Sequence, residues 1–227
     1  MTAVLGVCFL PEEVIAALYA GRNEEKAGFM AAYMKDRFPF LGIARPERAA
    51  LARNFLRGAR KAAAVDWALV DRLWGLPERE FQYLAVDYLA AAKGRVAADD
   101  IGRLAGLVTA KSWWDTVDAL ATVVVGDLCA RHPELVGGHM VGWSAGANIW
   151  LARTAILFQL KYKEKTDTEV LGLIIRNTCG TKEFFLNKAI GWALREYSKT
   201  DREWVAAFIA GHRLHTLSVR EGSKYLG

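Results

Sequence analysis

Residues 111–118, with the sequence KSWWDTVD, place two tryptophans and two carboxylates close together. Ser112 is followed three residues later by Asp115, just before an apolar run. This spacing is typical of a helix start in which a serine cap and an acidic residue satisfy free backbone amides. It predicts Ser112 as the N-cap and explains Asp115 structurally. Asp118 lies one turn further on, beyond the amides that an anion would cap, so its presence needs another explanation.

Helical spacing gives Asp118 a neighbour with which it could do chemistry. Trp114 lies four residues earlier and shares its face, about a third of a turn from the side expected to be buried. The predicted buried stripe consists of Trp113, Val117, Leu120 and Val124. A wide aromatic side chain and an acid are therefore expected beside the core, where they could form part of a functional site. The alternative is an edge tryptophan that covers its neighbour and an aspartate paired with a basic residue.

The composition indicates a globular protein with a bias towards polyanionic partners. The chain has 227 residues, of which 53% are hydrophobic, enough to fill one large core or two small ones. Its net charge of +5 makes nucleic acid the first partner to test. Charged residues of both signs make up 24% of the chain, so this is a bias and not a basic tail.

Cysteine and histidine usage gives no support for a metal site. Cys8, Cys129 and Cys179 are odd in number, far apart and without a C-x-x-C spacing, which favours a reducing cytoplasm over a disulfide framework. His212 and His215 lack a Cys or acidic partner and are expected at the surface. The chain also lacks a nucleotide-binding fingerprint and an iron–sulfur cysteine set. We therefore expect no metal and no cofactor.

Two apolar stretches are not expected to enter a membrane. The run 2–10 lacks a basic start and leads into Pro11, which is typical of a helix N-terminus and not of a signal peptide. Residues 135–152 carry no Asp, Glu, Lys or Arg, but several glycines interrupt them. They are expected to form a helix, a loop and a new helix.

A repeat of two helices runs through most of the chain. Predicted starts recur at intervals of 34, 36, 34 and 35 residues, at Glu78, Ser112, Asn148, Lys182 and Leu217. Shorter amphipathic segments lie between or before them, at 67–74, 100–108, 133–143, 169–177 and 203–210. A unit of this length cannot bury its own apolar face, so neighbouring units must stack.

The expected fold is all-α. One or two further helices are predicted in residues 11–38, and the β-branched clusters lie within helical patterns without hairpin turns. The consensus of tetratricopeptide repeats is absent, which favours irregular HEAT-like repeats. We predict a single domain over residues 1–227, in which such repeats stack into a curved superhelix.

Aligning the second helices of successive units places three cations at one repeat position, three residues after an apolar position. The apolar residues are Trp150, Phe185 and Leu217. The cations Arg153, Lys188 and Arg220 would form a line along one face, which suits a phosphate backbone. The alternative is ordinary solvated charge.

Many segments of the chain match a known family in order. They are 33–35, 40–43, 45–48, 76–82 (LPEREFQ), 111–118, 148–151, 156–163 (ILFQLKYK), 182–185, 188–192 and 194–197. Together they resemble the AlkD family of bacterial DNA alkylation-repair glycosylases, from roughly Glu24 to Tyr225. The resemblance implies HEAT-like repeats around duplex DNA. It also implies hydrolysis of the N-glycosidic bond of positively charged alkylated purines, such as 3-methyladenine and 7-methylguanine.

The resemblance also implies roles for individual residues. Asp118 would be the catalytic carboxylate, Trp114 and Trp192 would line the lesion site, and Arg153 would help to hold the DNA there. In this family the lesion stays in or near the base stack. Further matches to family positions near DNA are Tyr33, Lys161 and Arg195.

An alkylated purine is already cationic, so it leaves without a general acid, and the transition state moves positive charge onto the deoxyribose. Asp118 could stabilise that charge and orient the attacking water. Two other functions stay open: a catalytically silent DNA-binding module, which the intact Asp118 disfavours, and a protein-interaction scaffold, which the cationic line disfavours. We expect a cytoplasmic monomer that binds double-stranded DNA containing alkylated bases.

Overall fold

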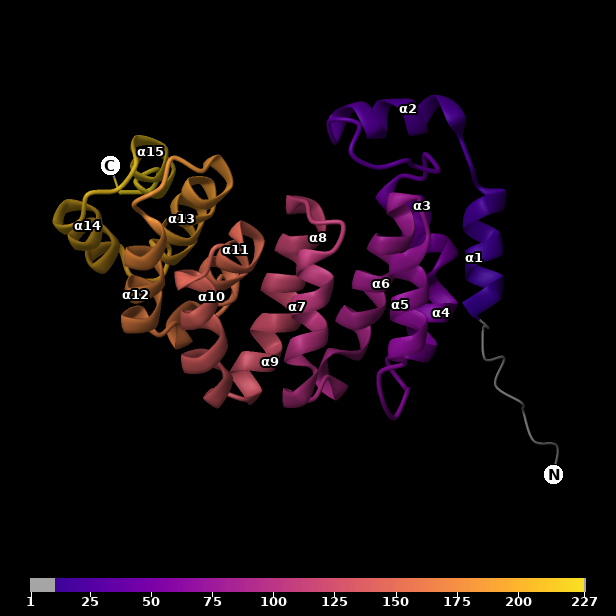
Figure 1. The fold of residues 1–227 in the computed structure, drawn as a ribbon, viewed down its shortest axis with the longest axis horizontal. Helices are drawn as coiled ribbons and strands as arrows, with labels where there is room; N and C mark the ends of the chain where they lie inside the picture. The colour runs from indigo at the N-terminus through magenta and orange to yellow at the C-terminus, as the bar shows by residue number, and fades with distance from the viewer. Residues whose placement is uncertain (1–10, 227) are drawn as a thin grey trace. The chain divides into compact units, whose positions relative to one another are not determined.

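The computed structural model describes residues 11–226, and the regular structure within that range is helical, without a strand (Figure 1). The prediction of an all-α helical-repeat fold is confirmed. The chain divides into two compact units, one ending at Val96 and the other beginning at Ala97. The prediction of a single domain stays a prediction, and the run 2–10 with Cys8 lies outside the described residues. In the described part, no helix is long and apolar enough to cross a membrane.

The first unit contains the N-terminal helices and the helices of the first predicted repeat. They are α1 (Pro11–Ala20), α2 (Glu24–Tyr33), α3 (Arg45–Leu51), α4 (Arg53–Ala59), α5 (Trp67–Gly75) and α6 (Arg79–Ala92), followed by a 3-10 turn at Lys93–Arg95. Asp66 caps α5 by accepting a hydrogen bond from the Leu69 amide at 3.0 Å. The two helices expected in residues 11–38 and the helix expected over 67–74 are thus present.

A buried carboxylate organises the loop between α2 and α3. Glu80 has no exposed surface, and its oxygens accept hydrogen bonds from the backbone amides of Leu41, Gly42 and Ile43 at 2.9, 2.9 and 3.1 Å. Gly42 has a φ of 84°, and a Cβ there would overlap the carbonyl oxygen of Asn23. Segments 40–43 and 76–82, which carry part of the family resemblance, therefore hold each other in place.

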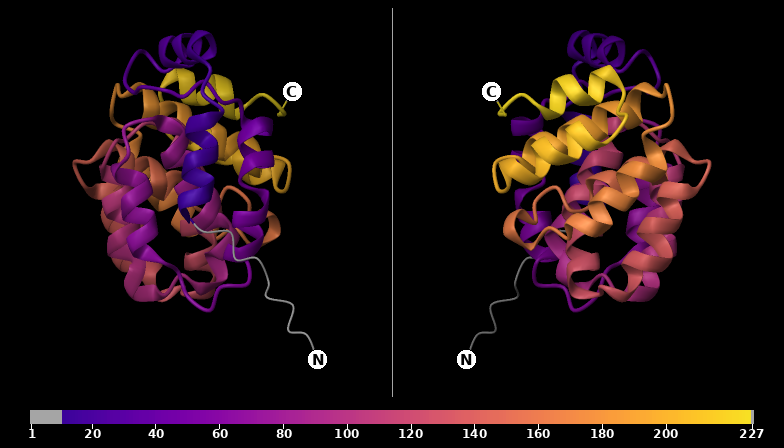
Figure 2. Two further views of the ribbon diagram at one scale, coloured as in Figure 1. Left: turned by 90° about the vertical axis from the view of Figure 1, so that its right-hand side faces the viewer. Right: turned by 90° about the vertical axis from the view of Figure 1, so that its left-hand side faces the viewer.

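The second unit contains the repeats that carry most of the predicted site. It begins with a 3-10 turn (Ala98–Asp100), and its α-helices are α7 (Ile101–Thr109), α8 (Trp114–Ala119), α9 (Gly126–Arg131), α10 (Gly142–Ala145), α11 (Ile149–Leu157), α12 (Thr168–Thr178), α13 (Phe184–Tyr197), α14 (Arg202–Gly211) and α15 (Thr216–Gly222). π-Helical turns (Leu120–Val125 and Val136–Val141) precede α9 and α10, and a 3-10 turn (Lys163–Lys165) follows α11. Observed helix starts lie close to the predicted ones, and α11 packs against both α8 and α13. α15 packs against α13. The yellow C-terminal helices α14 and α15 face the viewer on the right of Figure 2.

Two segments differ from the prediction in their winding. The helix begun by α8 widens into a π-helical turn at Leu120–Val125 before it continues as α9, and the segment predicted at 133–143 is largely π-helical. Apolar periodicity does not distinguish the two windings here, because a single π-helical turn is too short to change the apolar pattern visibly. Gly126 follows the first π turn, and a Cβ there would overlap the Phe158 carbonyl oxygen, so glycine permits the close approach.

Candidate active site

The start of α8 differs from the capping pattern read from the sequence. Trp113, with extended φ and ψ of −159° and 158°, is the N-cap, and the helix begins one residue later. The Ser112 hydroxyl instead donates to the Val108 carbonyl oxygen at 2.7 Å, at the end of α7. The Asp115 carboxylate accepts from the Thr116 amide at 2.9 Å. The predicted capping box was therefore wrong, although Asp115 still stabilises a first-turn amide.

The buried side of α8 forms an aromatic cluster with the next two repeats. The predicted stripe of Trp113, Val117, Leu120 and Val124 is buried, as expected. The ring centroid of Trp113 lies 5.8 Å from that of Trp150 and 5.0 Å from that of Phe185. Trp150 and Phe185, which the repeat alignment made equivalent, are themselves 5.0 Å apart. The cluster packs α8, α11 and α13 together next to the charged groups described below.

Asp118 and Arg153 form a bidentate ion pair between α8 and α11. Arg153 donates from Nε to Oδ1 at 2.6 Å and from Nη2 to Oδ2 at 2.8 Å. Its remaining nitrogen, Nη1, donates to the carbonyl oxygen of Phe185 on α13. The Arg153 side chain is 5% exposed and that of Asp118 is 15% exposed. The guanidinium is thus buried between three successive repeats, while the carboxylate keeps some contact with solvent.

This geometry corrects the predicted line of cations. Arg153 occupies the aligned position, but its guanidinium is turned inward to Asp118 and does not lie open to a phosphate backbone. Lys188 and Arg220 keep exposed side chains, at 41% and 75%. Spacing alone did not separate the buried cation from the exposed ones, because the difference depends on which acid lies opposite each position.

Burial and the arginine act on the Asp118 carboxyl in opposite directions. Burial raises the pKa of Asp118 above its usual range, while the hydrogen bonds and charge of Arg153 counteract part of that rise. A carboxylate has two lone pairs on each oxygen, and Arg153 engages one on each. The partly exposed carboxylate therefore retains acceptor capacity for a water molecule or a developing positive charge.

The backbone after Asp118 is also fixed. The Thr122 hydroxyl donates to the Asp118 carbonyl oxygen at 2.8 Å, within the turn where α8 gives way to the π helix. Irregular turns of this kind occur frequently at functional sites. Arg153 thus holds the Asp118 carboxylate, and Thr122 holds the Asp118 backbone carbonyl.

One predicted lesion-site tryptophan lies on α8 with Asp118, and the other lies on α13, which Arg153 contacts through the Phe185 carbonyl oxygen. Trp114 is half-buried and one turn before Asp118 on α8. Trp192 is half-buried on α13, seven residues after Phe185, which places it on nearly the same side of the helix and roughly 10 Å further along. Arg153 contacts α8 through Asp118 and α13 through the Phe185 carbonyl oxygen. It thereby connects the two helices that carry the tryptophans.

The remaining predicted DNA contacts are dispersed. Lys161 is exposed in the turn that follows α11, whereas Lys188 and Arg195 on α13 both pair with Glu221 on α15. Tyr33 is 70% exposed on α2, in the other unit.

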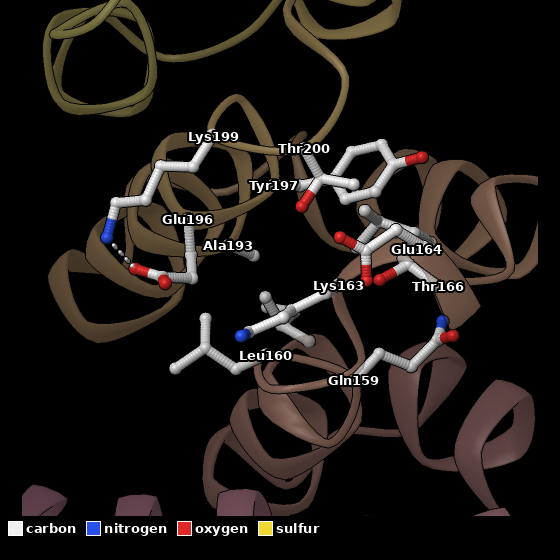
Figure 3. A pocket seen from close by; sticks show the side chains of 12 residues that line it. Gln159, Leu160, Lys163, Glu164, Thr166, Ala193, Glu196, Tyr197, Lys199 and Thr200 are labelled. Atoms are coloured by element: carbon white, nitrogen blue, oxygen red, sulfur yellow. Dashed lines mark hydrogen bonds and ion pairs between the residues drawn. The ribbon is translucent and has the colours of Figure 1, made fainter.

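Two cavities in the second unit lie away from Asp118. One, of about 300 Å³, lies between the ends of α11 and α13, where Lys199 pairs with Glu196 at 2.6 Å (Figure 3). The other, of about 620 Å³, is lined by Lys161, Lys165 and the buried Cys129, whose thiol pKa is raised by burial to about 12. Neither cavity is lined by Asp118, Trp114 or Trp192, and of the predicted site residues only Lys161 lines one of them.

Metal ligation finds no support in the described part of the chain, where no group of three His, Cys, Asp or Glu side chains could hold an ion. His215 caps α15 by accepting from the Leu217 amide at 3.1 Å, and His212 contacts the Phe208 carbonyl oxygen at 2.8 Å. Both histidines thus have local structural contacts.

Sequence reasoning missed two groups at these clusters. Phe185 was assigned only an apolar role, yet its carbonyl oxygen accepts from Arg153. Glu221 was not singled out, yet it pairs with two of the predicted DNA contacts. A signal for Glu221 existed, because it directly follows the aligned cation Arg220.

The helices and the buried acid–arginine pair define a helical-repeat protein with an ionised cluster between successive repeats. The chain belongs to the family of DNA alkylation repair enzymes, whose model matches residues 14–226. It is similar to a solved structure described as a predicted DNA alkylation repair enzyme from Enterococcus faecalis. The two share 36% sequence identity and a TM-score of 0.84 over 91% of this chain and 97% of the other. A comparison with curated proteins finds no match.

Proposed function

We propose that this chain is a DNA glycosylase of the AlkD type. It would hydrolyse the N-glycosidic bond of positively charged alkylated purines, of the 3-methyladenine and 7-methylguanine class, in duplex DNA. The observation that carries the proposal is the Asp118 carboxylate, largely buried and held through both oxygens by Arg153, in a member of a family of DNA alkylation repair enzymes.

The reaction suits a fixed carboxylate without a general acid. The bond between the sugar C1′ and the purine nitrogen breaks, and its electrons neutralise the positive charge of the base. C1′ then takes oxygen from water, which releases a proton to solvent. Because positive charge passes to the sugar in the transition state, a preorganised carboxylate lowers the barrier electrostatically.

Arg153 has a positioning role in this proposal. Its charge offsets part of the field of Asp118, but its two hydrogen bonds fix the carboxylate plane so that the remaining lone pairs point in defined directions. The faces of Trp114 and Trp192 would attract the cationic base, at about 0.5–2 kcal/mol each. Neutral bases would gain less.

The two cavities described above lie away from the proposed catalytic group. Neither the 300 Å³ nor the 620 Å³ cavity is lined by Asp118, Trp114 or Trp192. An enzyme that extrudes its target base needs a pocket to receive it. We propose that the lesion is engaged while it stays in or near the stack.

The test is release of free base from duplex DNA treated with a methylating agent. Chromatography of the released bases should show 3-methyladenine or 7-methylguanine, and the DNA should gain an equal number of abasic sites. Binding to the duplex without base release would point to a silent DNA-binding module. Failure both to bind and to release bases would favour an interaction scaffold.

A further inference from the structure

Glu221 on α15 bridges two cations of α13. Its Oε1 lies 2.8 Å from Lys188 Nζ, and its Oε2 lies 2.7 Å from Arg195 Nη1. Arg220 Nη2 lies further away, at 3.9 Å from Oε1. Lys188 and Arg195 are seven residues apart, about two helical turns, so one carboxylate spans two cations on the same side of α13.

The packing of α15 on α13 fixes the position of this carboxylate. A Cβ at Gly191 would lie 2.6 Å from the Glu221 Cβ, so only glycine allows the observed approach of the two helices. The fully buried Ser218 donates its hydroxyl to the Asn187 carbonyl oxygen at 2.9 Å. The bridge is therefore built into the helix interface.

The cations remain open to a competing anion. The Glu221 side chain is only 17% exposed, whereas Lys188 is 41% and Arg195 24% exposed. The hydrogen bond from Lys188 holds the pKa of Glu221 below its usual range, so the carboxylate is charged at neutral pH. A DNA phosphate offers the same kind of oxygen acceptors to lysine and arginine.

We infer that Glu221 is a specificity-determining residue, which occupies Lys188 and Arg195 in place of a DNA phosphate and thereby restrains binding to undamaged duplex. The inference rests on the proposed function, because it requires that the α13 face meets DNA. Non-specific affinity comes from cations that neutralise phosphates, and an internal carboxylate both competes for those cations and repels the backbone.

The experiment measures binding of undamaged duplex DNA by fluorescence anisotropy over a range of salt concentrations. Glu221→Gln should bind roughly 3- to 10-fold more tightly at low salt, with a steeper dependence on salt. Glu196→Gln is the matched control, because it also removes one negative charge. Glu196 lies on α13 and pairs with Lys199. The control should change affinity much less. Equal effects in both variants, or weaker binding by a folded Glu221→Gln, would overturn the inference.

A variant that lacks both cations distinguishes two causes of tighter binding. One cause is the release of Lys188 and Arg195 from Glu221, and the other is the change in net charge. In a Lys188→Gln/Arg195→Gln protein, adding Glu221→Gln should increase affinity much less than it does in the wild type, and a gain of equal size would overturn the inference. Should Glu221→Gln fail to fold, Glu221→Asp takes its place. It keeps the charge but is one methylene shorter than the bridge requires, so a smaller gain in the same direction is expected.

Base release can also be measured in the presence of excess undamaged DNA. This measurement would not change if Glu221 had only a structural role. The Glu221→Gln protein should lose more of its rate to the competitor than the wild type does. If the wild type releases alkylated bases and Glu221→Gln gains no affinity, this inference alone fails. If the wild type neither binds duplex DNA nor releases bases, the proposed function fails and the inference fails with it.

Discussion

Arg153 meets Asp118 with two parallel hydrogen bonds, of 2.6 and 2.8 Å, in a place where neither side chain is more than 15% exposed. A pair this buried contributes little net stability while intact, because desolvation offsets the attraction between its charges. Removal of one partner is costly, because it leaves the other charge buried and uncompensated. The pair therefore links the integrity of the fold to the geometry of the proposed catalytic group.

Asp118→Asn should lower excision of a cationic alkylated purine by about 10- to 1000-fold, because it removes one preorganised charge from the transition state. Duplex binding should persist. Single-turnover base release measures the effect. The control, Asp115→Asn, should leave the rate nearly intact and lower stability modestly, since Asp115 accepts from the Thr116 amide. Wild-type excision by Asp118→Asn, or a larger catalytic loss in the control, would show that the roles of the two aspartates are wrongly assigned.

Arg153→Ala should destabilise the protein by about 3–5 kcal/mol, because the Asp118 carboxylate stays buried without its partner. Urea unfolding followed by circular dichroism measures this. Arg220→Ala is the control, because its side chain is 75% exposed and should change the free energy of unfolding by less than about 0.5 kcal/mol. If Arg153 were instead exposed to solvent and free to bind phosphate, Arg153→Ala would leave the free energy of unfolding unchanged. That result would contradict the buried pairing with Asp118.

Lys161→Ala should weaken duplex binding and reduce the magnitude of the salt slope by about one, as expected for loss of one phosphate contact. Lys161 is exposed and lies in the segment that carries the family resemblance. Anisotropy titrations at several salt concentrations measure the slope. An unchanged slope would remove Lys161 from the proposed DNA interface.

Glu80→Gln should lower the free energy of unfolding by roughly 2–4 kcal/mol, because the neutral amide cannot accept all three backbone hydrogen bonds as well as a carboxylate does. Chemical denaturation measures the loss. Glu47→Gln, at an exposed position 3.9 Å from Lys26, should be nearly neutral. Similar small effects in both variants would mean that Glu80 does not hold the loop between α2 and α3.

Stability should depend on pH through Glu221. Its pKa is lowered in the folded protein, first by the hydrogen bond from Lys188, so the folded state binds a proton less readily than the unfolded chain. Its contribution is present above the ordinary pKa of 4.5 and is lost as pH falls through the lowered folded value. The midpoint temperature of thermal unfolding should therefore fall less steeply between neutral pH and about pH 3 for Glu221→Gln than for the wild type. Parallel profiles would show that the bridge does not form in solution.

The sequence by itself determined those features of this protein that depend on local interactions. Apolar spacing acts within a few positions, so the paired helices, the buried stripe of α8 and the helix start near Asn148 followed from the sequence. The winding of Leu120–Val125 did not, since one π-helical turn is too short to be distinguished from an α-helical turn by its apolar pattern. The catalytic role given to Asp118 came from resemblance to a family and stays a prediction.

The partners of the charged side chains were decided by the tertiary structure. Asp118 and Arg153 are 35 residues apart, and Glu221 lies 26 residues after Arg195. A long cation reaches whichever acid the packing of neighbouring helices places beside it. Equivalent spacing therefore put Arg153 and Lys188 in one predicted line, yet the contacts of α8 with α11 buried the first, and those of α15 with α13 left the second partly open. The difference depends on helix packing, which arises only when distant repeats meet.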